Sequence, residues 1–482
     1  MNFSVIARVL GLLMMIFSFT LVPPMLVSLI YQDGTLNAFL YALFITFGIG
    51  FLVWLPVRNH KRDLKTRDGF VITVLFWLVL AFSGSVPLYI AEQPALSYTD
   101  AFFESLSGWS TTGATVITGL DNLPESILWY RQQLQWLGGM GIIVLAVAVL
   151  PMLGIGGMQL FRAEFPGPVK DSKLTPRITE TAKALWYIYL SITIACATAY
   201  WFAGMSLFDA IGHSFSTVAI GGFSTHDASI GYFDNPAIEA IAMIFMLIAV
   251  LNFGLHFYAW KNKSIVHYFI DSEFKFLFYI MLGGALLTIS ALWLTDTYTL
   301  TESVRNGLFQ LVSIATTTGF STESFSTWPV FLPVLLFMMA FIGGCAGSTG
   351  GGMKVIRVLL IYKQGIREIS RLIHPNAIIP IKINRRPVDD RVLESVWGFF
   401  SVYILTYMVM MVALLATGLD HVTAFSAVGA CLNNLGPGLG EVAAHYGNIS
   451  DVAKWILSIT MLLGRLEIFT FLVLISPVFW RN

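Results

Sequence analysis

Four short polar runs, each carrying a glycine, lie between the long apolar stretches of this chain. The last glycines of successive runs are 109, 97 and 117 residues apart. Glycine adopts backbone dihedrals that other residues avoid. Backbone carbonyls held in this way can replace the water shell of a monovalent cation without adding formal charge. The spacing therefore predicts a cation site built from four similar loops. The runs are 109–113, 219–223, 316–320 and 433–437.

Three residues of each run are the candidate cation-binding residues, with the glycine holding the shape and the two residues before it offering carbonyls. They are Thr111, Thr112, Gly113, Ile220, Gly221, Gly222, Thr317, Thr318, Gly319, Asn434, Leu435 and Gly436. The second and third runs share Gly-Phe-Ser-Thr, and the first and third share Thr-Thr-Gly. We therefore expect a pseudo-four-fold ring rather than a perfect one. The alternative is a set of helix-packing glycines, which is disfavoured because the runs lie between spans.

The composition indicates that these loops belong to a membrane protein. Of the 482 residues, 56% are apolar and 12% are charged, whereas soluble domains carry about 25% charged residues. Several stretches of about 20 apolar residues are long enough to cross a hydrocarbon core of about 30 Å. The first of them, 5–30, lacks a small-residue cleavage site and is interpreted as a retained helix. Cys196, Cys345 and Cys431 lie in apolar segments and imply no disulfide framework.

Charge is distributed unevenly although the net charge is zero. If the helices alternate in direction, 24 of the 28 Lys and Arg fall on one side. The positive-inside rule makes that side cytoplasmic and puts both termini there. The glycine-bearing runs then belong to the opposite, more acidic side, where negative charge would concentrate cations. Simple solubility of the outer loops is the alternative explanation of those acids.

The predicted architecture is an all-α polytopic membrane protein, with four pseudo-symmetric helix–pore loop–helix repeats around one central pore plus an N-terminal helix pair. The pair occupies 1–67, with helices at 5–31 and 36–56. The repeats occupy 68–165, 166–262, 263–365 and, after a basic cytoplasmic linker, the rest of 366–482. Each repeat has two long helices, ten in all with the N-terminal pair. Between them lies a segment of about ten residues, which reaches only about 15 Å and therefore re-enters the membrane instead of crossing it. The predicted repeat segments are 69–93, 98–113 and 125–160; 180–204, 207–222 and 236–260; 274–296, 302–319 and 328–362; and 391–418, 421–436 and 450–479.

The second long helix of the third repeat contains a run of ten residues, 343–352, of which six are glycine. Each glycine costs roughly 1 kcal/mol in a helix relative to alanine, so we expect an irregular loop below the filter that could plug the pore. Close helix packing is the alternative. The candidate gating residues are Gly343, Gly344, Gly347, Gly350, Gly351, Gly352, Lys354 and Arg465.

Arg465 lies in the middle of the last predicted span, where a charge usually faces a cavity or a partner. Glu467 points to another side of the helix and is not its natural partner. We therefore expect Arg465 to donate hydrogen bonds to carbonyls of the glycine run and to hold the loop shut. A purely structural buried ion pair is the alternative.

The four helix–loop–helix units, one glycine per loop and the Gly-Gly-Cys-Ala-Gly-Ser-Thr-Gly-Gly-Gly run resemble the Trk/Ktr/HKT superfamily of potassium transporters over essentially the whole chain. The extra helix pair is similar to the bacterial TrkH-type branch. The resemblance implies potassium as substrate, with Gly113, Gly222, Gly319 and Gly436 completing a potassium-selective filter, and an arginine at 465 beside an intramembrane gating loop. It also implies a homodimer in the bacterial inner membrane and a cytosolic, nucleotide-binding regulatory subunit of the TrkA type. Asn433, Asn434 and Pro437 depart from the other loops and should break the four-fold symmetry.

The predicted function is therefore potassium uptake through a selective, gated, channel-like pore, without enzymatic activity and without a cofactor. A proton- or sodium-coupled potassium symporter on the same fold remains the alternative. An intramembrane hydrolase based on Ser348 would need a base such as His256 nearby, and no spacing indicates one. The basic stretch from 367 to 386 could bind anionic lipid or the regulatory subunit, and no nucleic acid partner is expected.

Overall fold

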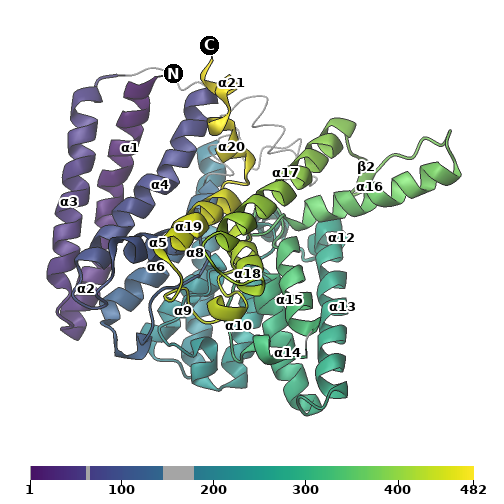
Figure 1. Ribbon diagram of the computed structural model, residues 1–482, viewed down its shortest axis with the longest axis horizontal. Helices are drawn as coiled ribbons and strands as arrows, with labels where there is room; N and C mark the ends of the chain where they lie inside the picture. The colour runs from purple at the N-terminus through teal and green to yellow at the C-terminus, as the bar shows by residue number, and fades with distance from the viewer. Residues whose placement is uncertain (1, 61–65, 145–177, 330, 482) are drawn as a thin grey trace.

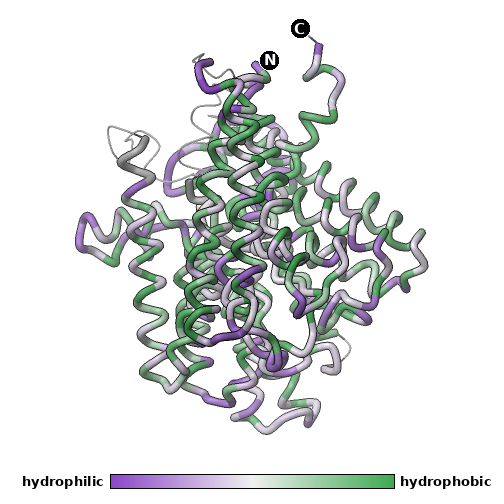
Figure 2. The backbone as a smooth tube through the Cα atoms, turned by 90° about the vertical axis from the view of Figure 1, so that its left-hand side faces the viewer, coloured by the Kyte–Doolittle hydropathy of each residue, from purple (hydrophilic) through white to green (hydrophobic). Residues whose placement is uncertain are grey.

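The computed structural model describes residues 2–60, 66–144, 178–329 and 331–481. Long helices dominate it, and both termini lie at the same end of the molecule (Figure 1). Most of the long helices are hydrophobic along much of their length (Figure 2). Within the described residues, six helices are long and apolar enough to cross a membrane, or eight if each of two bent pairs is one span. The chain is thus a multi-pass helical protein. The predicted helix residues 145–160 and most of two basic connections lie outside the described residues.

The N-terminal pair consists of α1 (Phe3–Ser18), η1 (Phe19–Leu21), α2 (Val22–Tyr31) and α3 (Leu36–Trp54). The single helix predicted over 5–31 is interrupted at η1 because prolines occupy the first turn of α2, where they cannot donate to the preceding turn. Gly11 of α1 and Gly50 of α3 face each other so closely that a Cβ on Gly11 would lie 2.7 Å from the Gly50 oxygen. Small residues allow this close approach of two membrane helices.

Each of the four repeats has a long helix, a short helix and a second long helix. The first repeat contains α4 (Thr66–Ile90), α5 (Tyr98–Trp109) and α6 (Glu125–Val144). The second contains α8 (Ile178–Phe202), α9 (Leu207–Ala219), α10 (Pro236–Ala249) and α11 (Phe253–Lys261). The third contains α13 (Ser272–Leu294), α14 (Leu300–Ala315), α15 (Phe331–Ile342) and α16 (Val355–Ile373), with α12 (Val266–Ile270) before it. The fourth contains α17 (Asp390–Leu415), α18 (His421–Leu432), α19 (Asp451–Arg465), α20 (Phe469–Ile475) and α21 (Pro477–Trp480).

The four short helices, α5, α9, α14 and α18, all begin in the same way. A small polar side chain precedes each of them and accepts a hydrogen bond from a backbone N–H of the first turn. Such a cap satisfies a donor that has no partner within the helix. The capping residues are Ser97, Ser206, Thr299 and Asp420. The sequence therefore fixes where each short helix starts.

The second long helix is broken in each of the last three repeats, whereas we predicted a break only in the third; in the first repeat its described part, Glu125–Val144, is one continuous helix. The predicted helix 236–260 bends by 90° between α10 and α11, and the predicted helix 450–479 bends by 115° between α19 and α20. At the first break, Asn252 leaves helical geometry and caps Gly254 with its side chain. At the second, Glu467 and Ile468 both have positive φ, 54° and 57°.

The basic linker before the fourth repeat is more ordered than predicted. Helix α16 extends to Ile373, and a small antiparallel pair, β1 (Lys382–Ile383) and β2 (Arg386–Pro387), follows it. Figure 1 shows α16 and this hairpin projecting away from the main body of the protein. Among the described residues these two short strands are the only β-structure, and the rest of this part of the chain is helices joined by turns and irregular loops.

Candidate ion filter and gate

The four predicted filter loops share one backbone conformation. In each loop the glycine and the residue two positions before it have positive φ, between 52° and 93°. The non-glycine residues in this strained region are Thr111, Ile220, Thr317 and Asn434. Side chains other than glycine rarely adopt this conformation, so its occurrence at four equivalent positions indicates that the repeats are structurally equivalent.

The same loops end their short helices with the same pair of hydrogen bonds. The N–H of the residue before each glycine donates to the carbonyl five residues earlier, as in Thr112 to Ser107 at 2.9 Å. The N–H one residue further back donates to the carbonyl three residues earlier, as in Thr111 to Gly108 at 2.9 Å. This pattern is a Schellman motif, which satisfies two of the carbonyls left over at a helix end. The carbonyls of the loop residues themselves remain available for a ligand.

The four loops contact one another in a closed cycle. A Cβ built on Gly113 would overlap the carbonyl oxygen of Gly221, and one on Gly222 would overlap that of Thr318. Gly319 faces the Leu435 oxygen in the same way, and Gly436 faces the Thr112 oxygen, which would lie 2.7 Å from the added carbon. Each glycine therefore abuts the residue before the glycine of the next loop, in the order 1–2–3–4–1. All twelve predicted filter residues thus belong to one ring.

The glycine-rich run between α15 and α16 packs directly against this ring. The N–H of Gly351 donates to the Thr317 hydroxyl at 2.8 Å, and the N–H of Gly352 donates to the Asn433 carbonyl at 3.1 Å. The Thr349 hydroxyl donates to the Val218 carbonyl at 2.9 Å. The run therefore contacts the second, third and fourth repeats at the ends of their short helices. This segment, 343–352, is hereafter called the inner loop.

Two cationic side chains donate hydrogen bonds to adjacent carbonyls of the inner loop. The Lys354 ammonium donates to the Gly350 carbonyl at 2.5 Å, and the Arg465 guanidinium donates to the Thr349 carbonyl at 3.3 Å. Arg465 is 5% exposed and also donates to the Gly138 carbonyl at 3.4 Å. No carboxylate among the described residues pairs with it. A buried, unneutralised positive charge is therefore placed beside the loop under the ring.

Glu467 does not pair with Arg465, and Ser348 does not hydrogen-bond to His256. Glu467 forms an ion pair with Arg357 at 2.5 Å, which leaves Arg465 to the inner loop. The Ser348 hydroxyl donates to the Cys345 carbonyl at 2.7 Å. The ring nitrogens of His256 contact the Tyr268 hydroxyl and the Ile248 carbonyl, so this histidine is not placed to act as a base for Ser348.

A carboxylate that we did not predict anchors the other side of the inner loop. Glu273, 4% exposed at the start of α13, accepts the N–H of Ala346 at 2.8 Å and the N–H of Ile356 at 3.2 Å. Ala346 lies within the inner loop, and Ile356 lies in the first turn of α16. The N-terminus of a helix favours such a negative charge. Glu273 therefore ties the inner loop and the first turn of α16 to the start of α13.

Behind the first two filter loops, α6 carries a row of buried polar side chains that the sequence analysis also missed. Arg131 is 1% exposed and forms an ion pair with Glu104 of α5 at 2.8 Å. Glu104 lies in the middle of α5, and it also accepts the N–H of Val116 at 2.9 Å. The available signal was the Arg-Gln-Gln-Leu-Gln sequence at 131–135 inside a predicted membrane helix.

A second missed cluster braces the outer side of the same two repeats. The His226 ring contacts Asp121 at 2.5 Å and Asp209 at 3.5 Å, and it stacks on Tyr232 with the ring centroids 3.4 Å apart. Burial lowers the pKa of His226, but the hydrogen bonds and charges of the two carboxylates outweigh it and raise the pKa above the usual 6.5. Asp121 belongs to the first repeat and Asp209 to the second, so this histidine links the two.

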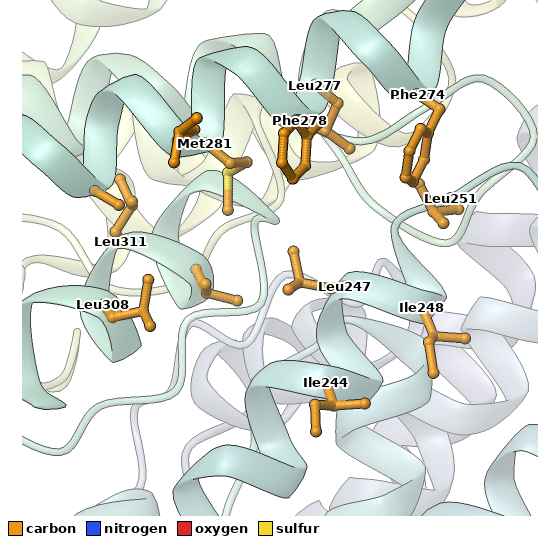
Figure 3. Close-up of a pocket in the computed structure, with 13 residues that line it drawn as sticks. Ile244, Leu247, Ile248, Leu251, Phe274, Leu277, Phe278, Met281, Leu308 and Leu311 are labelled. Carbon is orange, nitrogen blue, oxygen red and sulfur yellow. The ribbon is translucent and has the colours of Figure 1, made fainter. Parts of the chain in front are cut away.

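A cavity of about 440 Å³ lies between α10, α13 and α14, and none of the twelve filter residues lines it. Figure 3 shows that its walls are apolar side chains, among them Leu247, Phe278 and Met281. A site without oxygen or nitrogen ligands cannot replace the hydration of a cation. The candidate pathway therefore follows the ring of loops and not this cavity.

Comparison with known proteins agrees with this geometry. Residues 35–481 match the TrkH family, described as cation transport proteins. The chain is 61% identical to the Trk system potassium uptake protein TrkH of Halomonas elongata and 56% identical to that of Escherichia coli K12, with 100% of each chain covered. It superimposes on the crystal structure of the potassium transporter TrkH from Vibrio parahaemolyticus with a TM-score of 0.93, at 56% identity and with 100% of both chains covered. The chain therefore belongs to the TrkH family of cation transport proteins, which are transporters and not enzymes.

Proposed function

We propose that this protein takes up potassium through a pore formed by the ring of four loops, with the inner loop and Arg465 as its gate. The observation that carries the proposal is the closed cycle in which each filter glycine abuts the carbonyl of the next loop. Such a ring surrounds a single axis with backbone oxygens from four sides. Carbonyl oxygens in this arrangement replace the hydration shell of a monovalent cation.

Potassium is the proposed substrate for two reasons. The similar proteins of H. elongata and E. coli are named potassium uptake proteins. All four loops of this chain also carry glycine at the position where the neighbouring loop leaves no room for a side chain. The twelve filter residues, 111–113, 220–222, 317–319 and 434–436, are the proposed potassium-binding residues.

The inner loop is the proposed gate because it lies against the ring and is held from several sides. Its contacts with Thr317, Asn433, Lys354 and Arg465 occupy the space below the loops. Arg465 adds a buried positive charge there, which repels cations. Opening would require the loop to leave these contacts, with its glycines supplying the backbone freedom.

The proposed location is the inner membrane of a bacterium, with both termini in the cytoplasm. The basic residues of the linker lie on the same side as the termini if the helices alternate. The projecting α16 supports a cytoplasmic contact with a regulatory subunit of the TrkA type, a second copy of the chain or anionic lipid. Its far end exposes Ile369, Leu372 and Ile373 beside Arg371. Exposed apolar side chains mixed with basic ones are typical of surfaces that contact another protein or anionic lipid.

Coupling to protons or sodium remains the second candidate, and the structure offers more buried titratable groups than the sequence indicated. Glu104, His213 and Glu273 are at most 4% exposed. Each has hydrogen-bond partners within the protein. This pairing favours structural roles for the three groups over proton transfer.

Uptake of rubidium into proteoliposomes, with potassium, sodium or lithium as competitors, tests the proposal. Potassium should compete strongly, whereas sodium and lithium should compete weakly. Equal competition by all three ions would contradict the filter. A rubidium gradient that is built up only when a proton or sodium gradient is imposed would replace the channel by the symporter.

A further inference from the structure

The four filter loops are not held in place by the same means. In the first loop the hydroxyls of Ser110 and Thr112 hydrogen-bond to each other at 2.7 Å. In the third loop Thr316 and Thr318 form the same pair at the same distance. These loops therefore carry their own side-chain brace, built from a residue on each side of the strained position.

The fourth loop uses amide side chains instead. The Asn434 amide donates to the Thr112 hydroxyl at 2.9 Å and to the Met461 carbonyl at 3.1 Å. The Asn433 amide oxygen accepts from the Tyr403 hydroxyl at 2.6 Å. The departure of this loop from the Thr-Thr-Gly pattern thus replaces one polar brace by another.

The second loop has no polar side chain of its own, because residues 219–222 are Ala-Ile-Gly-Gly. Its brace comes from Gln135 of α6, which belongs to the first repeat. The Gln135 amide nitrogen donates to the Gly221 carbonyl at 2.6 Å, and its amide oxygen accepts the Phe223 N–H at 3.0 Å. A Cβ on Gly221 would overlap this amide, so the side chain occupies the space that the loop leaves empty.

Helix α6 presents Gln135 on a face that binds the second loop at three successive places. Gln132 donates to the Phe223 carbonyl at 3.2 Å, and Arg131 donates to the Ser224 carbonyl at 3.2 Å. These residues lie three and four positions before Gln135 and therefore share its side of the helix. Gln135 itself is fully buried, and both ends of its amide are hydrogen-bonded. Its orientation is therefore fixed on both sides.

We propose that Gln135 is a specificity-determining positioning residue, which holds the Gly221 carbonyl at the distance that favours potassium over sodium. The inference rests on the proposed filter. A carbonyl oxygen has two lone pairs, so Gly221 can accept from Gln135 and still face an ion. Without this donor, an apolar loop containing two glycines could let its carbonyl approach a smaller, dehydrated sodium ion.

The test is the sodium sensitivity of rubidium uptake in Gln135→Leu proteoliposomes. We expect the sodium concentration that halves rubidium uptake to fall about tenfold, the factor that corresponds to 1.4 kcal/mol. Gln135→Glu should behave similarly, because a carboxylate cannot donate to the Gly221 carbonyl. If neither leucine nor glutamate yields folded protein, Gln135→Asn carries the test, since its amide is one methylene too short to reach.

Gln133→Leu is the matched control. Gln133 is a buried amide on the same helix, but it donates to the Thr20 carbonyl at 2.6 Å, away from the filter. Its substitution should lower the thermal unfolding midpoint and leave sodium sensitivity unchanged. A purely structural role for Gln135 would give this same result, and a folded Gln135 variant with wild-type sodium sensitivity would overturn the inference.

A Gly222→Ser variant, tested in the same assay, distinguishes a failure of the proposed role of Gln135 from a failure of the proposed filter. If Gly222→Ser becomes sodium-sensitive and the Gln135 variants do not, the filter stands and the role of Gln135 is wrong. If both substitutions raise sodium sensitivity and the Gln133 variant does not, the inference is supported. If none of the variants differs from wild type, the ring is not the selective element and both proposals fail.

Discussion

Replacing Gly113 by serine should make rubidium uptake sensitive to sodium. Two effects act at this position. The φ of Gly113 is +81°, and left-handed backbone costs an ordinary residue about 1–2 kcal/mol. The new Cβ would also overlap the Gly221 oxygen, which must move by about 1.3 Å to reach an ordinary carbon–oxygen separation.

The displacement sets the expected size of the effect. The Gly221 carbonyl would lose its 2.6 Å hydrogen bond to Gln135, and a typical hydrogen bond contributes about 0.5–1.5 kcal/mol. If the ion preference falls by as much as this lost hydrogen bond contributes, the loss is about 0.5–1.5 kcal/mol. This range corresponds to a roughly twofold to tenfold fall in the preference for rubidium over sodium.

Gly34 provides the matched control, because it shares the backbone conformation but not the crowding. Its φ is +80°, and a Cβ there would meet nothing within 4 Å. Gly34→Ser should therefore show only the cost of the left-handed backbone, seen as a small fall in the thermal unfolding midpoint. Competition between rubidium and sodium in proteoliposomes of both variants separates the two effects. A folded Gly113→Ser protein with the ion preference of wild type would refute the steric reasoning.

Three further changes test the gate and the outer brace. Arg465→Ala should raise rubidium flux several-fold, because it removes a barrier charge and the contact with Thr349; unchanged or lower flux in folded protein counts against this role. Shortening the inner loop should give constitutive leak in the same assay, whereas an inactive but folded transporter would make the loop scaffolding. The raised pKa of His226 means that its brace with Asp121 is complete at acidic pH and is lost as pH rises through that pKa. The unfolding midpoint should therefore fall as pH rises from 6.5 through the raised pKa, and His226→Gln should flatten the dependence; an equally steep profile in the variant would exclude the histidine as its source.

The repeat architecture could be predicted because it depends on local patterns. Apolar stretches of sufficient length, with one glycine-bearing run between each pair, identify the four units. Counting six residues back from each last glycine gives Ser107, Ser216, Ser313 and Ala430. The carbonyls of these four residues accept the equivalent hydrogen bonds of the four Schellman motifs. The alignment of the repeats was therefore correct at single-residue level.

The order of the ring and the breaks in the long helices could not be predicted in the same way. Sequence does not say which loop neighbours which, since that depends on contacts between residues about 100 positions apart. The bend after α19 occurs at Glu467 and Ile468, which take positive φ although neither residue type favours it. Tertiary contacts impose this geometry, among them the ion pair of Glu467 with Arg357. The break after α10 had a weak local signal in Asn252, a good capping residue.

The polar contacts of α6 with the second filter loop were missed because its polar residues were counted as part of an ordinary span. Arg131, Gln132 and Gln135 are buried without facing the predicted pore directly. Their partners are the backbone of another repeat, which no spacing within one repeat can reveal. Polar side chains in a membrane helix are costly unless they have partners. The polar run at 131–135 inside a predicted span was therefore the signal that these residues contact another part of the protein.

The braces between the loops follow the same direction as the ring itself. Gln135 of the first repeat holds Gly221 of the second, and Asn434 of the fourth holds Thr112 of the first. The glycine contacts also run from each loop to the next, as from Gly113 to Gly221. A displaced Gly221 carbonyl therefore pushes on Gly113 of the loop before it and also loosens the brace from Gln135, which belongs to the same preceding repeat. Because interfaces this tightly packed do not deform continuously, a change in one loop should alter the ion preference of the whole ring.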